Sequence, residues 1–514
     1  MKINILGIRK NDLKKHLFII FTLSLFACSN IYKIQENQID CFQELEGIYL
    51  KFNDSFLSVD TSSKNILASI ERSKQGDSFK PIIKFSYHLI DHIIIDNEVI
   101  QCGGHFDFGV MSIDDSIKVY LVNNNVEVEY LMTFTFLPIV SISSQQMIKD
   151  EPKILSNIYL SNIHGQDYNN LMGGIEIRGA SSQNYAKKSY DIEFWEDKDG
   201  NKNTNHSFFH MRNDDDWILD AMYIDLSKVR NLTGMFVCSL ITTNRNSYLL
   251  TNQKLYQSGE LIELNVNNNY AGIYALNEQI DKKQLTLGNQ SFIYKSENYT
   301  EETLMEGISS LPSNSHLWNG FELKYPNYDN VQNWDKIYNL VAEVAYSSDS
   351  SFSSNIIEMI NFDNLIDFWI IINITQAIDN MGKNNFIFCN SKNEPLMFSV
   401  WDLDLTFGNQ AFYVSLPIDQ ILSNALIDRL ISLNVNNFNS LLQSRWNELN
   451  HQELHEKVIV YCTKKISQIK SSSADLREQN RWVSNLNLDI ELNYINSWLL
   501  ARLEILDNYV SSIM

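Results

Sequence analysis

Apolar residues recur along this chain with two different spacings, and the first is typical of β-strands. Short runs in which apolar residues alternate with polar ones are separated by Asn, Asp, Ser and Gly, as in strands joined by turns. The clearest of these runs are residues 47–52, 82–87, 117–122 and 126–130. The pattern therefore predicts a small β-sandwich-like domain over residues 28–136.

A second region begins near residue 137 and changes character along its length. It is strand-rich to about residue 292, with one helix over residues 225–242 and a hairpin that turns at residues 267–269. From about residue 328 the spacing becomes helical, and we expect helices over residues 334–346, 361–378, 420–445, 452–470 and 488–510. We therefore predict an α+β fold in which residues 137–514 form a strand-rich lobe (137–292) and a helical lobe (328–514).

The start of the chain has the composition of an export signal. A basic segment is followed by an apolar run over residues 17–26, which is too short to cross a bilayer. The run leads to Cys28 in a segment that resembles a bacterial lipobox, although Phe26 is larger than the residue usual at its position. We expect a lipoprotein signal peptide over residues 1–27 and an acylated Cys28 that anchors the protein in the cell envelope, at the outer membrane or cell surface. The alternative is an ordinary signal peptide with an incidental cysteine.

The charge of the chain limits what it binds. It carries 62 acidic and 41 basic residues, a formal net charge of −21. Because nucleic-acid binding depends on Lys and Arg that contact phosphates, this charge argues against a nucleic-acid partner. A nucleotide site would have to supply its own local cations. The cysteines form no CxxC pair, which argues against zinc, and Cys41 could form a disulfide with Cys102.

The segment with the clearest chemistry follows a predicted apolar helix. A polar loop contains Asp379 and Asn384, and the second of two predicted strands leads to Asp402 and Asp404. In protein kinases a catalytic Asp is followed at the fifth position by a metal-binding Asn, and a second metal-binding Asp comes later. Asp379 and Asn384 have this spacing, and alternation along a strand would place Asp402 and Asp404 on one face. The alternative is a structural Ca²⁺-like site, or polar residues at a hairpin turn.

Several short motifs occur in a fixed order along the second region. They are residues 177–182, 187–190, 216–219, 229–231, 270–278, 379–385 and 401–404. Over roughly residues 137–410 this set resembles the CotH family, which is known from a spore-coat protein kinase. The resemblance implies an atypical protein-kinase fold, ATP with Mg²⁺ or Mn²⁺, and phosphorylation of Ser or Thr in a protein. It also assigns the essential acidic pair to Asp379 and Asp402.

Within this resemblance, further residues are candidates for nucleotide binding. Arg178 is followed by a loop in which Ser181 and Ser182 would offer hydroxyls and backbone N–H groups to phosphate, although the loop lacks the GxGxxG pattern. Arg230 would either contact phosphate or hold a carboxylate. Glu278 ends a predicted strand where a hinge between lobes would begin, and it would meet the adenine amino group or be an ordinary solvated residue.

Two adjacent lysines open a predicted strand over residues 188–194. Lys188 would share a face with apolar residues and point into the cleft, whereas Lys187 would point to water. Since a lysine on an apolar face needs an anionic partner, Lys188 is the candidate phosphate-binding lysine, and a surface lysine is the alternative. The predicted helix over residues 225–242 contains no Glu after Asp225, so it offers no partner for the usual Lys–Glu ion pair.

The sequence leaves three functions open. The expected function is that of an exported, lipid-anchored protein kinase in which Asp379 orients the acceptor hydroxyl and Asn384, Asp402 and Asp404 bind the metal ion. The first alternative is a catalytically inactive surface-binding protein on the same fold. The second is transfer of another group from ATP, such as adenylylation. The protein substrate cannot be identified from the sequence.

Overall fold

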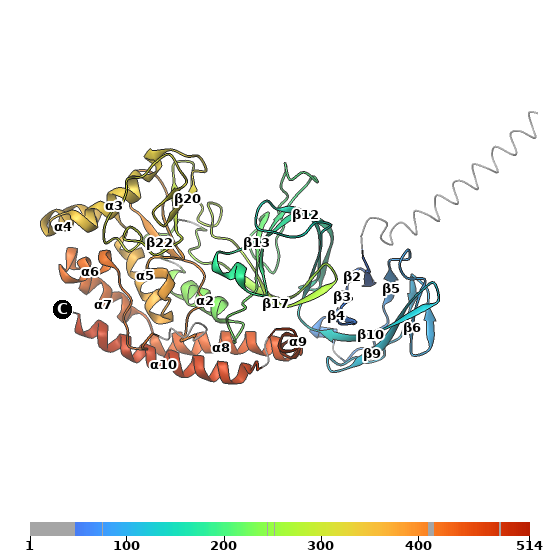
Figure 1. Ribbon diagram of the computed structural model, residues 1–514. Coiled ribbons are helices and arrows are strands. Elements are labelled where there is room, and N and C mark those ends of the chain that lie inside the picture. Colours follow the sequence, from blue (N-terminus) through green and yellow to red (C-terminus); the bar gives the residue numbers. More distant parts are fainter. Residues whose placement is uncertain are drawn as a thin grey trace, which may run out of the picture. The chain divides into compact units, whose positions relative to one another are not determined.

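The chain is described by a computed structural model that covers residues 47–513 apart from residues 75, 244, 251, 410–415 and 483–484. It forms two compact units (Figure 1). The first consists of the described residues up to Phe134 together with Asn265–Tyr270, and the second of Thr135–Leu264 and the described residues from Ala271 onward. The expected signal peptide, Cys28 and Cys41 lie outside the described residues, so the anchor and the Cys41–Cys102 disulfide stay predictions.

The first unit contains two β-sheets. One has the strand order β2 (Ser55–Phe56), β1 (Leu50–Phe52), β5 (Ile82–Phe85) and β8 (Gly104–His105). The other has the order β3 (Ser58–Asp60), β4 (Asn65–Ser69), β10 (Val126–Thr135), β9 (Ser116–Asn123), β6 (His92–Ile95) and β7 (Glu98–Ile100). A short 3₁₀ helix, η1 (Arg72–Lys74), follows β4. Strands occupy all four predicted runs, and Phe85 and Phe134 are buried side chains of this unit.

The strand-rich part of the second unit is a seven-stranded sheet that closes on itself. Its order is β11 (Ile139–Ser143), β12 (Ile154–Ile163), β13 (Gln166–Arg178), β14 (Ser189–Phe194), β15 (Asp216–Asp220), β17 (Asn269–Asn277) and β16 (Gly259–Val266). Arg178 pairs with Ser189 across β13 and β14. Ile218 pairs with Asn277 across β15 and β17. The ends of four neighbouring strands therefore lie side by side, and helix α2 (Arg230–Thr242) follows β15 in the chain.

The rest of the second unit combines a five-stranded sheet with helices (Figure 1). The sheet order is β19 (Leu317–Trp318), β20 (Phe321–Tyr325), β18 (Phe292–Ser296), β21 (Asn385–Cys389) and β22 (Met397–Val400). The helices are η3 (Val331–Trp334), α3 (Asp335–Tyr346), α4 (Asp349–Met359), α5 (Phe362–Thr375), α6 (Ala425–Ser432), α7 (Phe438–Glu448), α8 (His451–Lys470), α9 (Ala474–Arg481) and α10 (Leu488–Ser512). Helix α5 is buried nearly all round, as its apolar sequence requires, and it contacts β22, α2 and α10.

Helices and sheets in this combination confirm the predicted α+β class, and most predicted helices are present. The helix expected over residues 420–445 is instead divided into α6 and α7. Between them Asn434, Asn436 and Asn437 take positive φ angles of 44°, 49° and 61°. Asn tolerates this left-handed region better than most residues, and a left-handed residue cannot continue a right-handed helix. None of the helices in the described residues is both long enough and apolar enough to cross a membrane.

Candidate active site

The loop that follows helix α5 carries the first predicted site residue. Gln376 ends the helix in the left-handed conformation, and the chain then forms a short 3₁₀ helix, η4 (Ile378–Met381), that contains Asp379. The neighbouring side chain of Asn380 is buried and brackets the backbone of Trp401: its Oδ1 accepts from the Trp401 N–H and its Nδ2 donates to the Trp401 carbonyl, both at 3.1 Å. One amide thus ties the loop of Asp379 to the segment that carries Asp402.

Asp379, Asn384 and Asp402 meet in space. The Asn384 Nδ2 atom lies 3.4 Å from Asp379 Oδ2 and 3.5 Å from Asp402 Oδ2. Asn384 and Asp402 both have positive φ angles, of 52° and 57°. Asn and Asp are the residues with side chains that tolerate this conformation best, so the same two residues satisfy the backbone and bring polar side chains to the site.

One pocket brings several predicted residues together. Its lining includes Arg178, Ser182, Asp402 and Asp404. Strand alternation was the wrong reason to place Asp402 and Asp404 on one side, because β22 ends at Val400 and both residues follow the strand. They reach the pocket through the left-handed turn at Asp402. The Arg178 guanidinium stacks over the Trp401 ring at 5.4 Å.

Two polar residues that brace the carboxylates of the pocket were not among the predicted site residues. Asp220 ends β15 and Asn231 lies in the first turn of α2, and both line the pocket. The Asn231 Nδ2 atom donates to Asp220 Oδ2 at 2.9 Å, while its Oδ1 accepts from the Leu403 N–H at 3.0 Å. Asn231 therefore fixes both Asp220 and the backbone between Asp402 and Asp404. The sequence did offer a signal, because Asp220 directly follows the motif at residues 216–219 and Asn231 lies within the motif at residues 229–231.

The carboxylates of this pocket repel one another. Burial, followed by the nearby charge of Asp220, raises the pKa of Asp402 to about 6, although Arg178 opposes the shift. Burial and the charges of Asp402 and Asp220 raise the pKa of Asp404 well above its usual range. Burial also raises the pKa of Asp379, against the pull of Lys383, whose Nζ lies 3.8 Å from Asp379 Oδ2. A divalent cation would relieve this repulsion.

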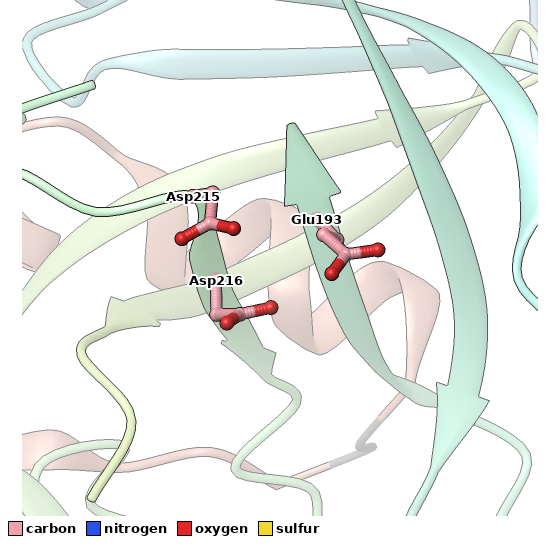
Figure 2. Close-up of side chains that lie close together, drawn as sticks. All are labelled: Glu193, Asp215 and Asp216. Carbon is pink, nitrogen blue, oxygen red and sulfur yellow. The ribbon is translucent and has the colours of Figure 1, made fainter. Parts of the chain in front are cut away.

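The donor set fits a hard cation such as Mg²⁺ or Mn²⁺. Such ions take carboxylate and amide oxygens. Asp402 and Asp404 supply carboxylates in one pocket, with Asp220 nearby. Asn384 lies beside Asp402 with its Nδ2 toward that carboxylate, so its amide would have to turn over to present Oδ1 to an ion. These residues would hold the ion, and the ion would in turn bind the oxygens of a phosphate chain. Among the described residues, the groups of three acidic side chains with oxygens within 4.8 Å of one another lie elsewhere, at Glu193, Asp215 and Asp216 (Figure 2) and at Asp214, Asp216 and Asp281.

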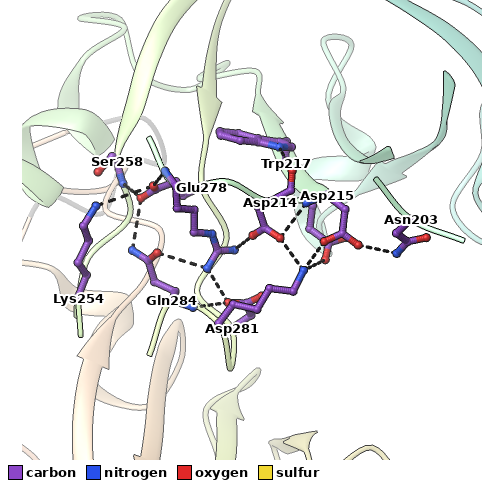
Figure 3. Close-up of polar contacts among 12 residues, drawn as sticks. Asn203, Asp214, Asp215, Trp217, Lys254, Ser258, Glu278, Asp281 and Gln284 are labelled. Carbon is purple, nitrogen blue, oxygen red and sulfur yellow. Dashed lines mark hydrogen bonds and ion pairs between the residues drawn. The ribbon is translucent and has the colours of Figure 1, made fainter. Parts of the chain in front are cut away.

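These other acidic groups already have cationic partners from the protein. The Lys283 Nζ atom lies 2.5 Å from Asp214 Oδ1 and 3.6 Å from Asp216 Oδ2, and it also pairs with Asp215. Arg212 pairs with Asp214 and lies 2.7 Å from Asp281. The contacts form one network at the start of β15 (Figure 3). In this network Lys283 and Arg212 pair with the four aspartates.

Glu278 belongs to the same network (Figure 3) and is not among the residues that line the pocket. Its carboxylate is fully buried and accepts hydrogen bonds from the backbone N–H of Arg212 at 2.8 Å and of Ser258 at 3.0 Å. Lys254 lies 4.0 Å away. The expectation of an ordinary solvated residue is therefore wrong, and this carboxylate holds the start of β16 beside the end of β17.

The two lysines before β14 differ from the sequence expectation. Lys187 is buried, where water was expected, and its Nζ lies 2.8 Å from Glu478 Oε1 on α9. It also lines the pocket. Lys188 is half-buried and donates to the carbonyls of Gln183 and Tyr185 at 2.5 and 2.6 Å. The strand begins only at Ser189, so strand alternation does not apply to either lysine.

Glu478 is the partner that sequence reasoning did not find. Its carboxylate is fully buried and also lies 3.3 Å from the Nζ of Lys228. Burial acts to raise the pKa of Glu478, but the attraction of Lys187 and Lys228 outweighs it, and the pKa is lowered. Burial lowers the pKa of Lys187 to about 8 in spite of Glu478. Because Glu478 lies almost three hundred residues after Lys187, no local pattern could pair them.

Arg230 and the loop after Arg178 complete the predicted set. Arg230 is buried and forms ion pairs with Asp225 at 2.7 Å and Glu491 at 2.8 Å, so the second of its two predicted roles, holding a carboxylate, is the one observed. It does not line the pocket. Ser181 and Ser182 lie in a 3₁₀ turn, η2 (Ser181–Asn184), where Ser181 is exposed and Ser182 lines the pocket.

Comparison with known protein families supports the sequence resemblance. The family model described as CotH kinase protein matches residues 175–506, a range that includes all the residues lining the pocket. A search of curated proteins found no match. The matched segment covers more than half of the chain, from β13 in the closed sheet to α10. This chain therefore belongs to the CotH kinase family.

Proposed function

We propose that this chain is an exported, lipid-anchored protein kinase that transfers the γ-phosphate of ATP to Ser or Thr of a protein with the help of Mg²⁺ or Mn²⁺. Membership of the CotH kinase family supports a kinase. In this proposal the closed sheet and α2 correspond to the strand-rich lobe of an atypical kinase, and the five-stranded sheet with α3–α10 corresponds to the helical lobe. The expected acylated Cys28 would hold the enzyme at the cell envelope.

The observation that carries the proposal is the meeting of Asp379, Asn384 and Asp402. The Asn384 amide lies within 3.5 Å of a carboxylate oxygen from each aspartate. Phosphoryl transfer needs one carboxylate for the attacking hydroxyl and an Asn with an Asp for the metal ion, and these three side chains have the required types and the required proximity. The Asp404 carboxylate lines the same pocket and is a candidate for an additional ligand.

In this proposal each residue of the site has its own role in phosphoryl transfer. The acceptor hydroxyl oxygen would attack the γ-phosphorus, its proton would pass to Asp379, and the bond to the bridging oxygen would break so that ADP leaves. The raised pKa of Asp379 makes it a better proton acceptor than an ordinary carboxylate. The metal ion, when bound, neutralises phosphate charge. Arg178, Ser182 and Lys187 line the pocket and would meet the phosphates.

Lys187 replaces Lys188 as the proposed phosphate-binding lysine. Its ammonium pairs with Glu478 at 2.8 Å and donates to the Ile273 carbonyl at 2.5 Å, and the residue lines the pocket. Lys188 is not among the residues that line the pocket, and its ammonium donates to two carbonyl groups. The Lys187–Glu478 pair would thus supply the Lys–Glu ion pair that kinases use to position phosphates. The carboxylate comes from α9, not from the helix that follows the strand.

Mass spectrometry of the purified chain after incubation with ATP and Mg²⁺ or Mn²⁺ tests the proposal. We expect phosphorylated Ser or Thr in wild-type protein and none in an Asp402→Asn variant. An AMP adduct in place of phosphate would show that the site transfers a different group. If the protein acquires neither phosphate nor AMP, and Mg·ATP does not stabilise its fold, the alternative of a surface-binding protein is favoured. A ligand at a hundredfold excess over its dissociation constant stabilises by about 2.7 kcal/mol, which a thermal shift detects.

A further inference from the structure

Two buried amide side chains in the pocket contain polar atoms that have no hydrogen-bond partner among the described residues. The side chains of Asn277 and Gln257 are only 1% and 4% exposed, and both line the pocket that contains Asp402 and Asp404. Neither the Nδ2 nor the Oδ1 atom of Asn277 has a partner among the described residues, and the same holds for Gln257 Oε1. A buried polar atom without a partner costs about 1–3 kcal/mol, so such groups call for a ligand or an ordered water.

The local structure places the backbone segments that carry the two amides next to each other. Asn277 ends β17, and the backbone N–H of the following residue, Glu278, donates to the Ser258 carbonyl at 2.9 Å. This bond places the segment of Gln257 beside the end of β17. Gly259 leaves space for the amide, because a Cβ atom at Gly259 would lie only 1.8 Å from Asn277 Oδ1. The sequence thus provides room for an unpaired amide inside the pocket.

The unpaired atoms have a definite chemical pattern. Asn277 offers a carbonyl acceptor beside an N–H donor, and Gln257 offers a second carbonyl acceptor. An amino group with two hydrogens next to a ring nitrogen satisfies all three, and adenine carries this arrangement at its amino edge. Asn and Gln bind adenine through such a two-point contact in other recognition settings. Phosphate groups, which have no donors when ionised, would leave both carbonyl oxygens unpaired.

We propose that Asn277 and Gln257 read the amino edge of the adenine base and so set the nucleotide specificity of the pocket. This inference rests on the proposed function, because it takes the ligand to be a nucleoside triphosphate. It moves base recognition from Glu278, whose carboxylate is occupied by backbone N–H groups, to its neighbour Asn277. Glu278 then acts as a positioning residue for the strand ends that carry the two amides.

The test compares four probes that share the triphosphate. Dissociation constants of the full chain are measured in Mg²⁺ for ATP, for GTP, for purine riboside triphosphate, which is ATP without the 6-amino group, and for inorganic tripolyphosphate. Wild-type protein should bind ATP at least about tenfold more tightly than purine riboside triphosphate, because the analogue leaves buried carbonyl oxygens unpaired. Equal affinities would show that water satisfies the amides and would overturn the proposal. Tighter binding of GTP than of ATP would overturn the assignment to adenine.

Variants locate the effect. Asn277→Leu keeps the approximate size of the side chain and should weaken ATP binding about tenfold or more, while tripolyphosphate binding stays unchanged. Gln257→Leu should act in the same direction. Gly259→Ala keeps both amide residues in the chain, but its added methyl group would displace the Asn277 side chain. This variant should therefore weaken ATP binding as well. Asn355→Leu, at an exposed amide on α4, is the matched control and should change nothing.

The design separates the two proposals. If wild-type protein binds neither ATP nor tripolyphosphate, the proposed kinase function fails, and the base-reading role fails with it. If it binds both probes and phosphorylates itself, but Asn277→Leu discriminates ATP from purine riboside triphosphate as strongly as wild type, only the base-reading role fails. Should Asn277→Leu not fold, the comparison of ATP with purine riboside triphosphate on wild-type protein still decides.

Discussion

Asp379 and Asp402 have different surroundings, and we expect their substitutions to have different effects. Asp379 lies in the 3₁₀ turn after α5 beside Lys383, whereas Asp402 shares the pocket with Asp404 and Asp220. Asp379→Asn should leave Mg·ATP affinity near normal and lower the rate of autophosphorylation or ATP hydrolysis by about a hundredfold or more, the usual scale for a lost proton acceptor. Asp402→Asn should lose both. Binding titrations and rates for the two variants give the comparison; equal losses of affinity would make Asp379 a metal ligand.

The raised pKa of Asp402 predicts how stability depends on pH. In the metal-free protein a carboxyl whose pKa rises from 3.8 to about 6 on folding favours the protonated state, so stability falls as pH rises through this interval. Asn resembles the protonated form. Asp402→Asn should therefore stabilise the metal-free protein by about 1–3 kcal/mol above pH 6, and by little near pH 4. Thermal unfolding at both pH values measures this, and a gain that does not depend on pH would mean that the charge of Asp402 is not its cause.

Metal affinity should change with pH in the opposite sense to stability. A carboxylate must lose its proton before it binds a cation. Mn²⁺ affinity should therefore increase as pH rises through 6, and the raised pKa of Asp404 acts in the same direction. Titration of Mn²⁺ at pH values on both sides of 6 tests this prediction. Affinity that is constant across this range would remove Asp402 from the metal site.

Single site residues could be predicted from the sequence where the residues that act together lie close to one another in the chain. Asp379 and Asn384 are five residues apart in one loop, so their spacing carried the information, and the structure brings them together with Asp402. Lys187 was misplaced because strand alternation was extended beyond the start of β14. The unpaired Asn277 could not be recognised, because an amide in a strand looks the same whether or not it has a partner.

At the scale of elements, the docking of α9 beside the strand region depends on one buried carboxylate. Glu478 pairs with Lys187 and Lys228, and all three side chains are fully buried. It also accepts from the Ile273 N–H of β17 at 2.8 Å. Removing one member of a buried ion pair leaves an uncompensated charge and costs about 3–5 kcal/mol. Because one carboxylate pairs with two lysines, the loss of folding stability depends on which of the three side chains is replaced.

Glu478→Gln should therefore destabilise the protein more than Lys187→Met. The first substitution leaves two buried ammonium groups without a counter-charge, and we expect a loss of about 3 kcal/mol or more. The second leaves Glu478 with Lys228, so the loss should be smaller. Urea unfolding of both variants measures the order, and Lys470→Met, at an exposed ion pair on α8, serves as the control. Equal losses, or the reverse order, would mean that Lys228 does not compensate Glu478.

Helices and hairpins could be predicted where the apolar spacing or the turn residues were not opposed by another local preference. α3, α5, α8 and α10 follow their apolar spacing closely, and the hairpin of β16 and β17 turns at the predicted asparagines. The predicted helix over residues 420–445 failed because local backbone preference overrode the apolar spacing at Asn434, Asn436 and Asn437. The closure of seven strands into one sheet depends on pairings between distant segments, which periodicity along the chain does not record.

At the scale of the whole molecule, the family match covers most of the second compact unit and almost none of the first. The match begins at residue 175 in β13, so the first unit lies outside it apart from Asn265–Tyr270. All the proposed chemistry belongs to residues of the second unit. The proposed lipid anchor precedes the first unit in the chain, so in chain order this unit lies between the proposed anchor and the segment that matches the family.

The anchor itself is the last prediction. Residues 17–26 form an apolar run that leads to Cys28, and acyl chains on this cysteine would hold the protein in the membrane because each buried methylene adds about 0.8 kcal/mol. Cys28→Ser removes the thiol that accepts the lipid, so the variant should move from the membrane fraction to the soluble fraction or accumulate unprocessed. Cys41→Ser is the matched control and should remain with the membranes. If the Cys28→Ser variant is processed and still partitions fully with membranes, the lipid anchor is excluded and another part of the chain holds the protein there.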